Sequence, residues 1–473
     1  MSGPTSSTAV RSSRGRRLVL AVILLVAAAA LAAALAMAHA LPPTGVAVQR
    51  HVRIASTDRL LVVSPHPDDE SIACAGLIQQ SLAAGAQVRV LWMTAGDHNI
   101  VGPPLLWRKV AVTPVQFRAI GRRRMQEAKA AAAVLGLQPS DLIFLGYPDG
   151  GLSSIFMKAW TSEPYRSGLT NAESVPYAES PVIGQPQTAT NLLTDVEQVM
   201  SSFHPTIVAY PNFIDAHPDH QATGLFVTAA LADLHMKPLC LEYLVHVRGW
   251  PRPLRYAPLA SDYAPTAVAA LGLTQAVVEL TPEQVTVKAR AIKAHASELL
   301  PLATLIAFAR RTELFLLPAG LNQSEDPART ARFFFPLSRS DDQERPVIQR
   351  FSARQTQEGL QLLLDCGRPL NRLESLDLFI FPLPVAGTFG SAPKLRIVYH
   401  GGSAAAEVSD LMHPEIPSVR LALFRSGTSL SLTLDRRMTG GAAQGVFVRI
   451  EKGTSDIDLV RSRTVWISLK PAM

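Results

Sequence analysis

Residues Leu61–Glu70 read LVVSPHPDDE, an apolar run that stops at a Ser-Pro and is followed by one imidazole and three carboxylates. The apolar run is typical of a buried strand, and the Ser-Pro dipeptide indicates that the strand ends there. His66, Asp68, Asp69 and Glu70 are therefore expected to cluster at a strand end. For Glu70 we expect a capping role, because its charge would favour the N-terminal dipole of a following helix.

The segment 57–325 alternates between strand-like and helix-like patterns. Arg59–Ser64 and Gln87–Thr94 are apolar runs of strand length, and the residues between them have the apolar spacing of a helix that stops at a glycine. A run of helix formers follows in Arg122–Leu137. This alternation predicts βαβ units and an α/β fold, with a Rossmann-like, mainly parallel sheet and helices on both of its faces.

The pattern changes near Gln323–Arg332, and segment 326–473 is expected to form a second, β-rich domain. Its short alternating segments are separated by Gly, Ser and Asp, and no convincing long helix interrupts them. Such a series predicts an all-β, sandwich-like domain. The expected strands are LDLFIF (376–381), KLRIVYH (394–400), VRLALF (419–424), SLSLTL (429–434), GVFVRIEKG (445–453) and TVWISL (464–469).

The N-terminus predicts a membrane segment. Residues 1–17 form a basic tail, Leu18–Ala38 are uncharged and mostly apolar, and 39–56 are expected as a linker. A helix over 18–38 would span roughly 30 Å, the thickness of the hydrocarbon layer, and the preceding arginines would keep its N-terminal end in the cytoplasm. A signal peptide cleaved after Ala40 stays open, because AHA fits a cleavage site. Both interpretations place the rest of the chain outside the cytoplasm, either anchored by a single span or secreted.

Charge and cysteine content exclude several classes of protein. The formal net charge is +7, but the first 40 residues hold four arginines and no acid, which leaves only +3 for the rest. This is a poor basis for nucleic-acid binding, and we expect no nucleic-acid partner. Three distant cysteines without a CxxC pair predict neither a cysteine-zinc site nor a disulfide scaffold. No GxGxxG follows the first strand, so we expect no nucleotide cofactor.

Acids and imidazoles follow four of the expected strands. Asp97 and Asp149 come after two of them, and the AHPDH stretch holds His217, Asp219 and His220 after another. Ligands of open parallel sheets lie at the carboxyl ends of the strands, so these side chains are expected to converge with the first stretch. A zinc hydrolase needs three His or carboxylate ligands, an open position, a base and an oxyanion stabiliser. The two HPD stretches together contain such a set.

The pair PHPDDE (65–70) and AHPDH (216–220) resembles the PIG-L/LmbE family of zinc-dependent N-deacetylases, which act on N-acetylglucosaminyl and related amides. RMQEAKAAAAVLG (124–136) resembles the R-x-x-E helix of that family, and FLGYPDG (144–150) resembles its G-x-P-D-G turn. KARAIKAHASEL (288–299) and FARRTELF (308–315) resemble its C-terminal catalytic helices.

The resemblance implies a role for each matching residue. His66, Asp69 and His220 would be the zinc ligands, and Asp68 the general base that activates water. His217 would stabilise the oxyanion or protonate the leaving amine, and Asp219 would orient it through a hydrogen bond. The positions that touch the sugar in the family are matched by Asp97, Arg124 and Asp149. Zinc is the expected cofactor, and Fe²⁺ stays open because a site of two His and one Asp accepts both.

We therefore expect an extracytoplasmic, metal-dependent N-deacetylase that hydrolyses the acetamide of an N-acetylated amino sugar in a glycan or glycolipid. The expected partners are this substrate and, through the N-terminal helix, the membrane. The alternative is a membrane-tethered carbohydrate-binding protein with an inactive hydrolase domain. The β-rich domain would either hold a glycan chain or only pack on the catalytic domain.

Overall fold

The computed structural model describes residues 49–98, 113–161, 163–247, 249–265, 268, 274–299, 303–318, 333–334, 348–372, 374–453 and 464–468. The expected membrane segment Leu18–Ala38 and the expected boundary at 325/326 both lie outside these residues. Within them, no helix is both long and apolar enough to cross a membrane.

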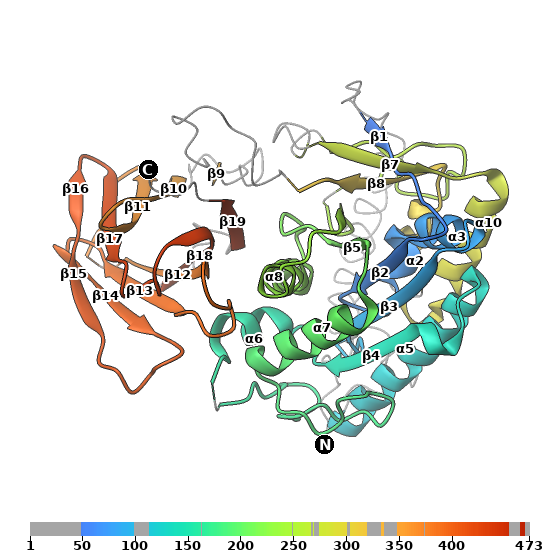
Figure 1. The fold of residues 1–473 in the computed structure, drawn as a ribbon, viewed down its shortest axis with the longest axis horizontal. Helices are drawn as coiled ribbons and strands as arrows, with labels where there is room; N and C mark the ends of the chain where they lie inside the picture. The colour runs from blue at the N-terminus through green and yellow to red at the C-terminus, as the bar shows by residue number, and fades with distance from the viewer. Residues whose placement is uncertain are drawn as a thin grey trace, which may run out of the picture.

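An eight-stranded, largely parallel sheet forms the centre of the first domain (Figure 1). The strands β2, β3, β4, β5 and β6 pair in parallel, and β8 pairs antiparallel with β6 and β7. Their order across the sheet is β1 (Gln49–His51), β7 (Gln275–Glu279), β8 (Thr312–Leu316), β6 (Leu239–Tyr243), β5 (Ile207–Pro211), β2 (Arg59–Ser64), β3 (Gln87–Thr94) and β4 (Leu142–Tyr147). The expected mainly parallel sheet is confirmed.

Alternation along β2 explains why helices cover both faces of this sheet. Leu60 and Val62 belong to one apolar core, whereas Leu61 and Val63 belong to the other, since successive side chains of a strand point to opposite faces. The first core includes residues of α2 (Asp69–Ala73), α3 (Ala75–Ala83), α5 (Pro114–Leu135) and α10 (Pro282–Ala294). The second includes residues of α6 (Leu152–Lys158), α7 (Ala189–Phe203) and α8 (Pro218–Asp233).

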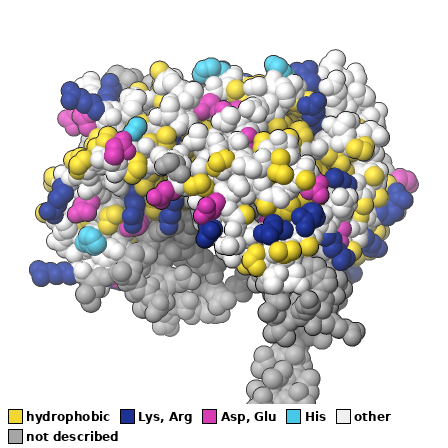
Figure 2. Space-filling view, turned by 90° about the horizontal axis from the view of Figure 1, so that it is seen from below, with side chains coloured by type: hydrophobic (Ala, Val, Ile, Leu, Met, Phe, Trp, Pro, Cys, Tyr) yellow, Lys and Arg dark blue, Asp and Glu magenta, His cyan; other side chains and the backbone are white. Residues whose placement is uncertain are grey.

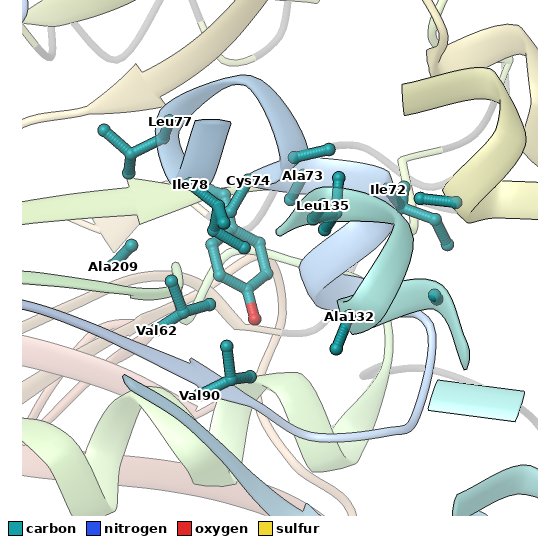
Figure 3. Close-up of a cluster of buried hydrophobic side chains, with 14 of the residues drawn as sticks. Val62, Ile72, Ala73, Cys74, Leu77, Ile78, Val90, Ala132, Leu135 and Ala209 are labelled. Atoms are coloured by element: carbon teal, nitrogen blue, oxygen red, sulfur yellow. The ribbon is translucent and has the colours of Figure 1, made fainter. Parts of the chain in front are cut away.

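Figure 3 shows part of the first core, where Leu77 and Ile78 of α3 and Leu135 of α5 gather with Val62 and Val90 of the sheet. All five side chains are buried. Fully burying a Leu, Ile or Val side chain stabilises a fold by roughly 1.5–3 kcal/mol each, so this layer holds the strand ends in place.

Local structure differs from the expectations in four places. FARRTELF (308–315), expected as a helix, has its second half in β8, which pairs with β7 in the sheet. The helix expected after the HPDDE stretch is divided at Cys74 into α2 and α3. The helix α5 begins at Pro114, well before Arg122, because Thr113 forms a capping box with Gln116. Within the expected linker 39–56, Gln49–His51 form β1, which pairs with β7 and so belongs to the sheet.

The second domain consists of two antiparallel sheets that share one apolar core. The five-stranded sheet contains β9 (Phe333–Phe334), β10 (Ile348–Gln355), β11 (Gly359–Cys366), β16 (Phe424–Ser426) and β17 (Ser429–Asp435). The six-stranded sheet contains β12 (Ser375–Pro384), β13 (Leu395–His400), β14 (Ala405–Asp410), β15 (Val419–Ala422), β18 (Ala443–Gly453) and β19 (Thr464–Ser468). All six expected segments contain strands, whereas β9, β10, β11 and β14 were not anticipated.

The strands β12 and β18 of the second domain lie near α6 and α8 of the first (Figure 1). An aromatic cluster joins the two domains there. Phe156 of α6 lies 5.4 Å from Phe381 and 5.9 Å from Phe447 between ring centroids. The carboxylate of Asp233, at the end of α8, accepts hydrogen bonds from the backbone N–H groups of Phe389 and Gly390. The β-rich domain therefore packs directly on the helices of the first domain.

On the face of the molecule shown in Figure 2, Lys and Arg side chains lie in several places among acidic and apolar ones. The basic residues of that face do not form one continuous patch.

Candidate active site

The sheet order brings the two HPD turns together. The strands β2 and β5 are parallel neighbours, with Leu60 opposite Ile207, so their carboxyl ends lie at the same edge. The turn after β2 holds His66, and the turn after β5 leads into α8 with His217 at its N-cap. The site therefore forms where the sheet topology predicts it, at the carboxyl ends of parallel strands.

Asp69 connects the two turns. Its Oδ2 lies 3.2 Å from His66 Nδ1 and 3.3 Å from His220 Nε2, and it accepts a hydrogen bond from the His66 backbone N–H at 3.0 Å. His66, Asp69 and His220 are all buried. The three residues expected as metal ligands thus meet around one carboxylate oxygen.

The charges around the two imidazoles fit a divalent cation. Burial would lower the pKa of His220, but Asp69 and Asp215 outweigh it and raise that pKa to about 10. The pKa of His66 is also raised, because Asp149, Asp219 and Asp69 outweigh the effect of burial. A pocket that stabilises positive charge on both rings would equally stabilise a metal ion.

A second observation indicates that the residues around His220 fit a metal ion. Both ring nitrogens of His220 are buried without a hydrogen-bond partner among the residues that the structure describes. Ligand atoms of His66, His217 and His220 lie within 4.8 Å of one another, as do those of Asp69, His220 and His246. Imidazole and carboxylate are the donors that zinc and ferrous iron take, so the residues present fit such an ion.

Asp68, the expected base, lies beside the buried guanidinium of Arg124. Asp68 Oδ2 is 3.5 Å from Arg124 Nη2, and Arg124 Nε is 3.3 Å from Glu298. Burial raises the pKa of Asp68, Arg124 lowers it, and Asp69 and Glu298 raise it again, to about 7. A carboxylate with that pKa can exchange a proton near neutral pH, as a general base requires.

His217 is held by the backbone that follows it. The Asp219 N–H donates to His217 Nδ1 at 3.2 Å, which assigns the ring proton to Nε2 when the imidazole is neutral. Burial, followed by the neighbouring His66 and His220, lowers the pKa of His217. The neutral ring can therefore donate a hydrogen bond from Nε2.

The Asp219 carboxylate does not make the hydrogen bond to His217 that the sequence led us to expect. It accepts from the backbone N–H groups of Gly150, at 2.6 Å, and Leu152, at 3.1 Å, and lies 3.4 Å from His66 Nε2. Because the α6 turn lies within reach of α8, these two amides take the place of the ring. Asp219 orients His217 through its backbone instead.

The three expected sugar contacts form one network at the edge of the site. Asp149 lies 3.4 Å from Arg124 Nη1 and 3.2 Å from His66 Nε2. Asp97 accepts hydrogen bonds from the Asp149 backbone N–H and the Tyr177 hydroxyl. Burial, followed by Asp149, raises the pKa of Asp97 to about 7. The structure brings these residues together, and their contact with a sugar stays a prediction.

The expectation for Glu70 is met only in part. Glu70 lies in the first turn of α2, as expected, but it is fully buried, and its carboxylate accepts hydrogen bonds from Trp92 Nε1 and the Ser71 hydroxyl instead of capping the helix. Arg124 is buried in the site, and Glu127 pairs with Arg123 at 2.9 Å. The difference at Glu70 arises because the tertiary fold places Trp92, distant in sequence, beside its carboxylate.

Two further residues belong to the site. The His246 ring lies 4.6 Å from that of His220 and 5.0 Å from that of His217 between centroids. Asp215 Oδ2 lies 3.4 Å from His220 Nδ1. The signal that could have identified both is their position, since each follows a strand whose carboxyl end meets the same edge as β2.

Residues 61–231 match the family model described as PIG-L: GlcNAc-PI de-N-acetylase. The chain contains a PIG-L domain. The matched range includes both HPD turns together with Asp97, Arg124 and Asp149, and it ends before β6. The resemblance inferred from the two HPD stretches is confirmed.

Individual proteins resemble the PIG-L domain at moderate identity. A protein of Actinosynnema mirum named 1D-myo-inositol 2-acetamido-2-deoxy-alpha-D-glucopyranoside deacetylase is 32% identical over 181 residues, which cover 38% of this chain and 56% of that protein. A Streptomyces avermitilis protein of the same name is 34% identical over 174 residues, 36% of this chain and 52% of its own length. The chain spans about half the length of these relatives.

Among solved structures, the N,N'-diacetylchitobiose deacetylase from Pyrococcus horikoshii is similar to this chain. Its sequence is 18% identical, the match covers 57% of this chain and 87% of that one, and the TM-score is 0.36.

Proposed function

We propose that this chain is a metal-dependent N-deacetylase that hydrolyses the acetamide of an N-acetylated amino sugar of the N-acetylglucosamine type. One observation carries the proposal: His66, Asp69 and His220, from two separate turns, meet around a single buried carboxylate oxygen. The two relatives are named as deacetylases of a 2-acetamido-2-deoxy-glucopyranoside, and those names support the substrate class.

The metal would be held by His66, Asp69 and His220, and it would be zinc or ferrous iron. When bound, such an ion polarises an amide carbonyl and makes a nearby water more acidic.

Side chains of the PIG-L domain transfer the protons and stabilise the charge that develops in the reaction. Asp68 takes the proton of the water that adds to the amide carbonyl, while Arg124, 3.5 Å away, fixes its carboxylate. His217 donates from Nε2 toward the carbonyl oxygen, where negative charge develops. The C–N bond then breaks, the proton passes to the leaving amine, and the products are acetate and the free amino sugar.

The location of the enzyme is part of the proposal. The apolar run Leu18–Ala38, preceded by four arginines, supports an anchor with the catalytic domain outside the cytoplasm. The substrate would then be a surface or secreted polysaccharide, a cell-wall glycan or a glycolipid. Fusing residues 1–56 to alkaline phosphatase, which is active only outside the cytoplasm, and separately to β-galactosidase tests this orientation. N-terminal sequencing of the mature protein tests cleavage after Ala40.

The full-length chain, purified in detergent both in air and without oxygen, provides the test of the activity. Metal analysis and acetate release from N-acetylglucosamine oligomers are measured on the same preparation. About one equivalent of zinc or iron together with acetate release is expected. Bound metal without acetate release would still support a metal-dependent hydrolase, but it would exclude N-acetylglucosamine oligomers as its substrates. A folded protein with neither would favour the alternative of a tethered carbohydrate-binding protein.

A further inference from the structure

Asp215 lies on the loop between β5 and α8 and is completely buried. Its carboxylate accepts three backbone hydrogen bonds: Oδ1 from His217 N–H at 2.9 Å, and Oδ2 from Val245 N–H at 2.7 Å and His246 N–H at 2.9 Å. The same carboxylate thus fixes the backbone of two of the histidines of the site.

Asp215 also contacts a third histidine of the site, His220, through its side chain. Asp215 Oδ2 lies 3.4 Å from His220 Nδ1, and Asp69 Oδ2 lies 3.3 Å from His220 Nε2, so the ring stands between two carboxylates. A neutral imidazole carries one proton. Asp69 is itself a proposed metal ligand, so the ion would be shared by Asp69 and the nitrogen that faces it, Nε2, and the proton would lie on Nδ1 beside Asp215. Nε2 then presents its lone pair on the side of Asp69 and His66.

The position of Asp215 does not depend on the imidazoles alone. Its backbone N–H donates to the Asn212 carbonyl at 3.0 Å, and its carbonyl accepts from Gln221 Nε2 at 2.8 Å. The next residue, Ala216, donates to the His246 carbonyl at 3.0 Å. These bonds tie the loop after β5 to the end of β6, so the carboxylate is already in place before any ligand binds.

We propose that Asp215 is a positioning residue of the metal site, which holds His220 with Nδ1 protonated so that Nε2 is the metal-binding atom. The inference rests on the proposed function, because it assigns a role toward the metal of that site. A carboxylate behind a metal-binding histidine fixes the ring and raises its basicity, and loss of such a partner typically costs roughly 10- to 100-fold in metal affinity.

Asp215→Asn is the test variant because it keeps the shape of the side chain. The amide loses the charge, and its NH₂ group faces either the His217 N–H or the pair of N–H groups on Val245 and His246. The metal affinity of the full-length protein, stripped of metal, is measured by competition with a chromogenic chelator. We expect the dissociation constant for zinc to rise roughly 10- to 100-fold.

Asp233→Asn is the matched control. Asp233 also accepts two backbone hydrogen bonds, from Phe389 and Gly390, but it lies at the contact between the domains. This variant is expected to keep the wild-type affinity for zinc even where its stability falls. An unchanged zinc affinity in Asp215→Asn, or an equal loss of zinc affinity in both variants, would overturn the proposal. Asp215 would then only hold the loop after β5 against the end of β6.

A measurement on the wild-type protein covers the case in which Asp215→Asn does not fold. In zinc-loaded protein labelled with ¹⁵N-histidine, His220 should show a protonated Nδ1 and a coordinated Nε2, assigned by comparison with His220→Gln. Coordination through Nδ1 would overturn the proposal. Wild-type protein that takes up no metal contradicts the proposed function and this inference together, whereas uptake that Asp215→Asn does not weaken contradicts the inference alone.

Discussion

The Asp219 carboxylate accepts a hydrogen bond from the Gly150 backbone N–H at 2.6 Å, which joins the start of α8 to the turn after β4. The two residues belong to different motifs, AHPDH and YPDG, at strand ends that are not adjacent in the sheet. The bond brings Asp149 of that turn to the imidazole of His66, 3.2 Å away. One buried acid therefore holds together the two sides of the site.

Asp219→Asn should lower both stability and turnover. Each carboxylate oxygen receives one backbone N–H, so an amide leaves one of these donors facing an NH₂ group, at a cost of about 1–3 kcal/mol. Urea unfolding measures this loss. Asp195→Asn is the control, because the partners of Asp195 are the Tyr147 hydroxyl and the Gln185 amide, which can reorient. An equal loss in both variants would contradict the special role of the two backbone donors.

Asp68→Ala should separate metal binding from turnover. Asp68 lies next to the expected ligands without being one of them, so the variant is expected to keep the metal and to lose turnover by roughly 10²- to 10⁴-fold. His220→Ala should lose both. Metal content by elemental analysis and acetate release are measured on each variant. Unchanged turnover in Asp68→Ala would refute the assignment of the base.

Asp97→Asn should change the pH dependence of stability. The pKa of Asp97 is about 7 in the fold against 3.8 ordinarily, because burial and then Asp149 disfavour the carboxylate. Between these values the folded protein binds more protons than the unfolded one, so the contribution of Asp97 to stability falls as pH rises from about 4 to 7. The asparagine cannot ionise. The free energy of unfolding of Asp97→Asn, relative to that of the wild type, should therefore rise by at most about 4 kcal/mol between about pH 4 and pH 7 and then level off.

Urea unfolding at half-unit pH steps checks this expectation. The shape of the difference curve decides, because the amide also introduces an offset that does not depend on pH. A difference that stays constant from pH 4 to pH 8 would mean that Asp97 is ionised in the fold throughout.

Phe447→Ala should show how strongly the β-rich domain is attached. Phe447 is fully buried, with ring centroids 5.9 Å from Phe156 of α6 and 5.3 Å from Phe389. Truncating a buried phenylalanine costs about 3–5 kcal/mol, which calorimetry would detect as a lower melting temperature. Phe424, on the same domain, is 72% exposed, and Phe424→Ala should change stability by less than about 0.5 kcal/mol. Similar melting temperatures for both variants would mean that the aromatic cluster does not stabilise the protein.

The sequence by itself predicted the residues of the candidate site and most of the architecture. Apolar runs that alternate with helix formers predict the parallel sheet, because both periods are local properties of the chain. The shared edge of the strand ends predicts that the two HPD stretches converge, and their resemblance to the PIG-L/LmbE family implies the ligands His66, Asp69 and His220. Short alternating segments likewise predict the strands of the second domain.

Only the tertiary structure decided how the side chains of the site are partnered. Arg124 lies between Asp68, Asp149 and Glu298, which are far apart in sequence, and Glu70 is turned inward to Trp92. Asp215 and His246 enter the site because β5 and β6 are neighbours in the sheet. Periodicity records which face of an element is buried, whereas a hydrogen-bond partner depends on distances that form only when the sheet assembles.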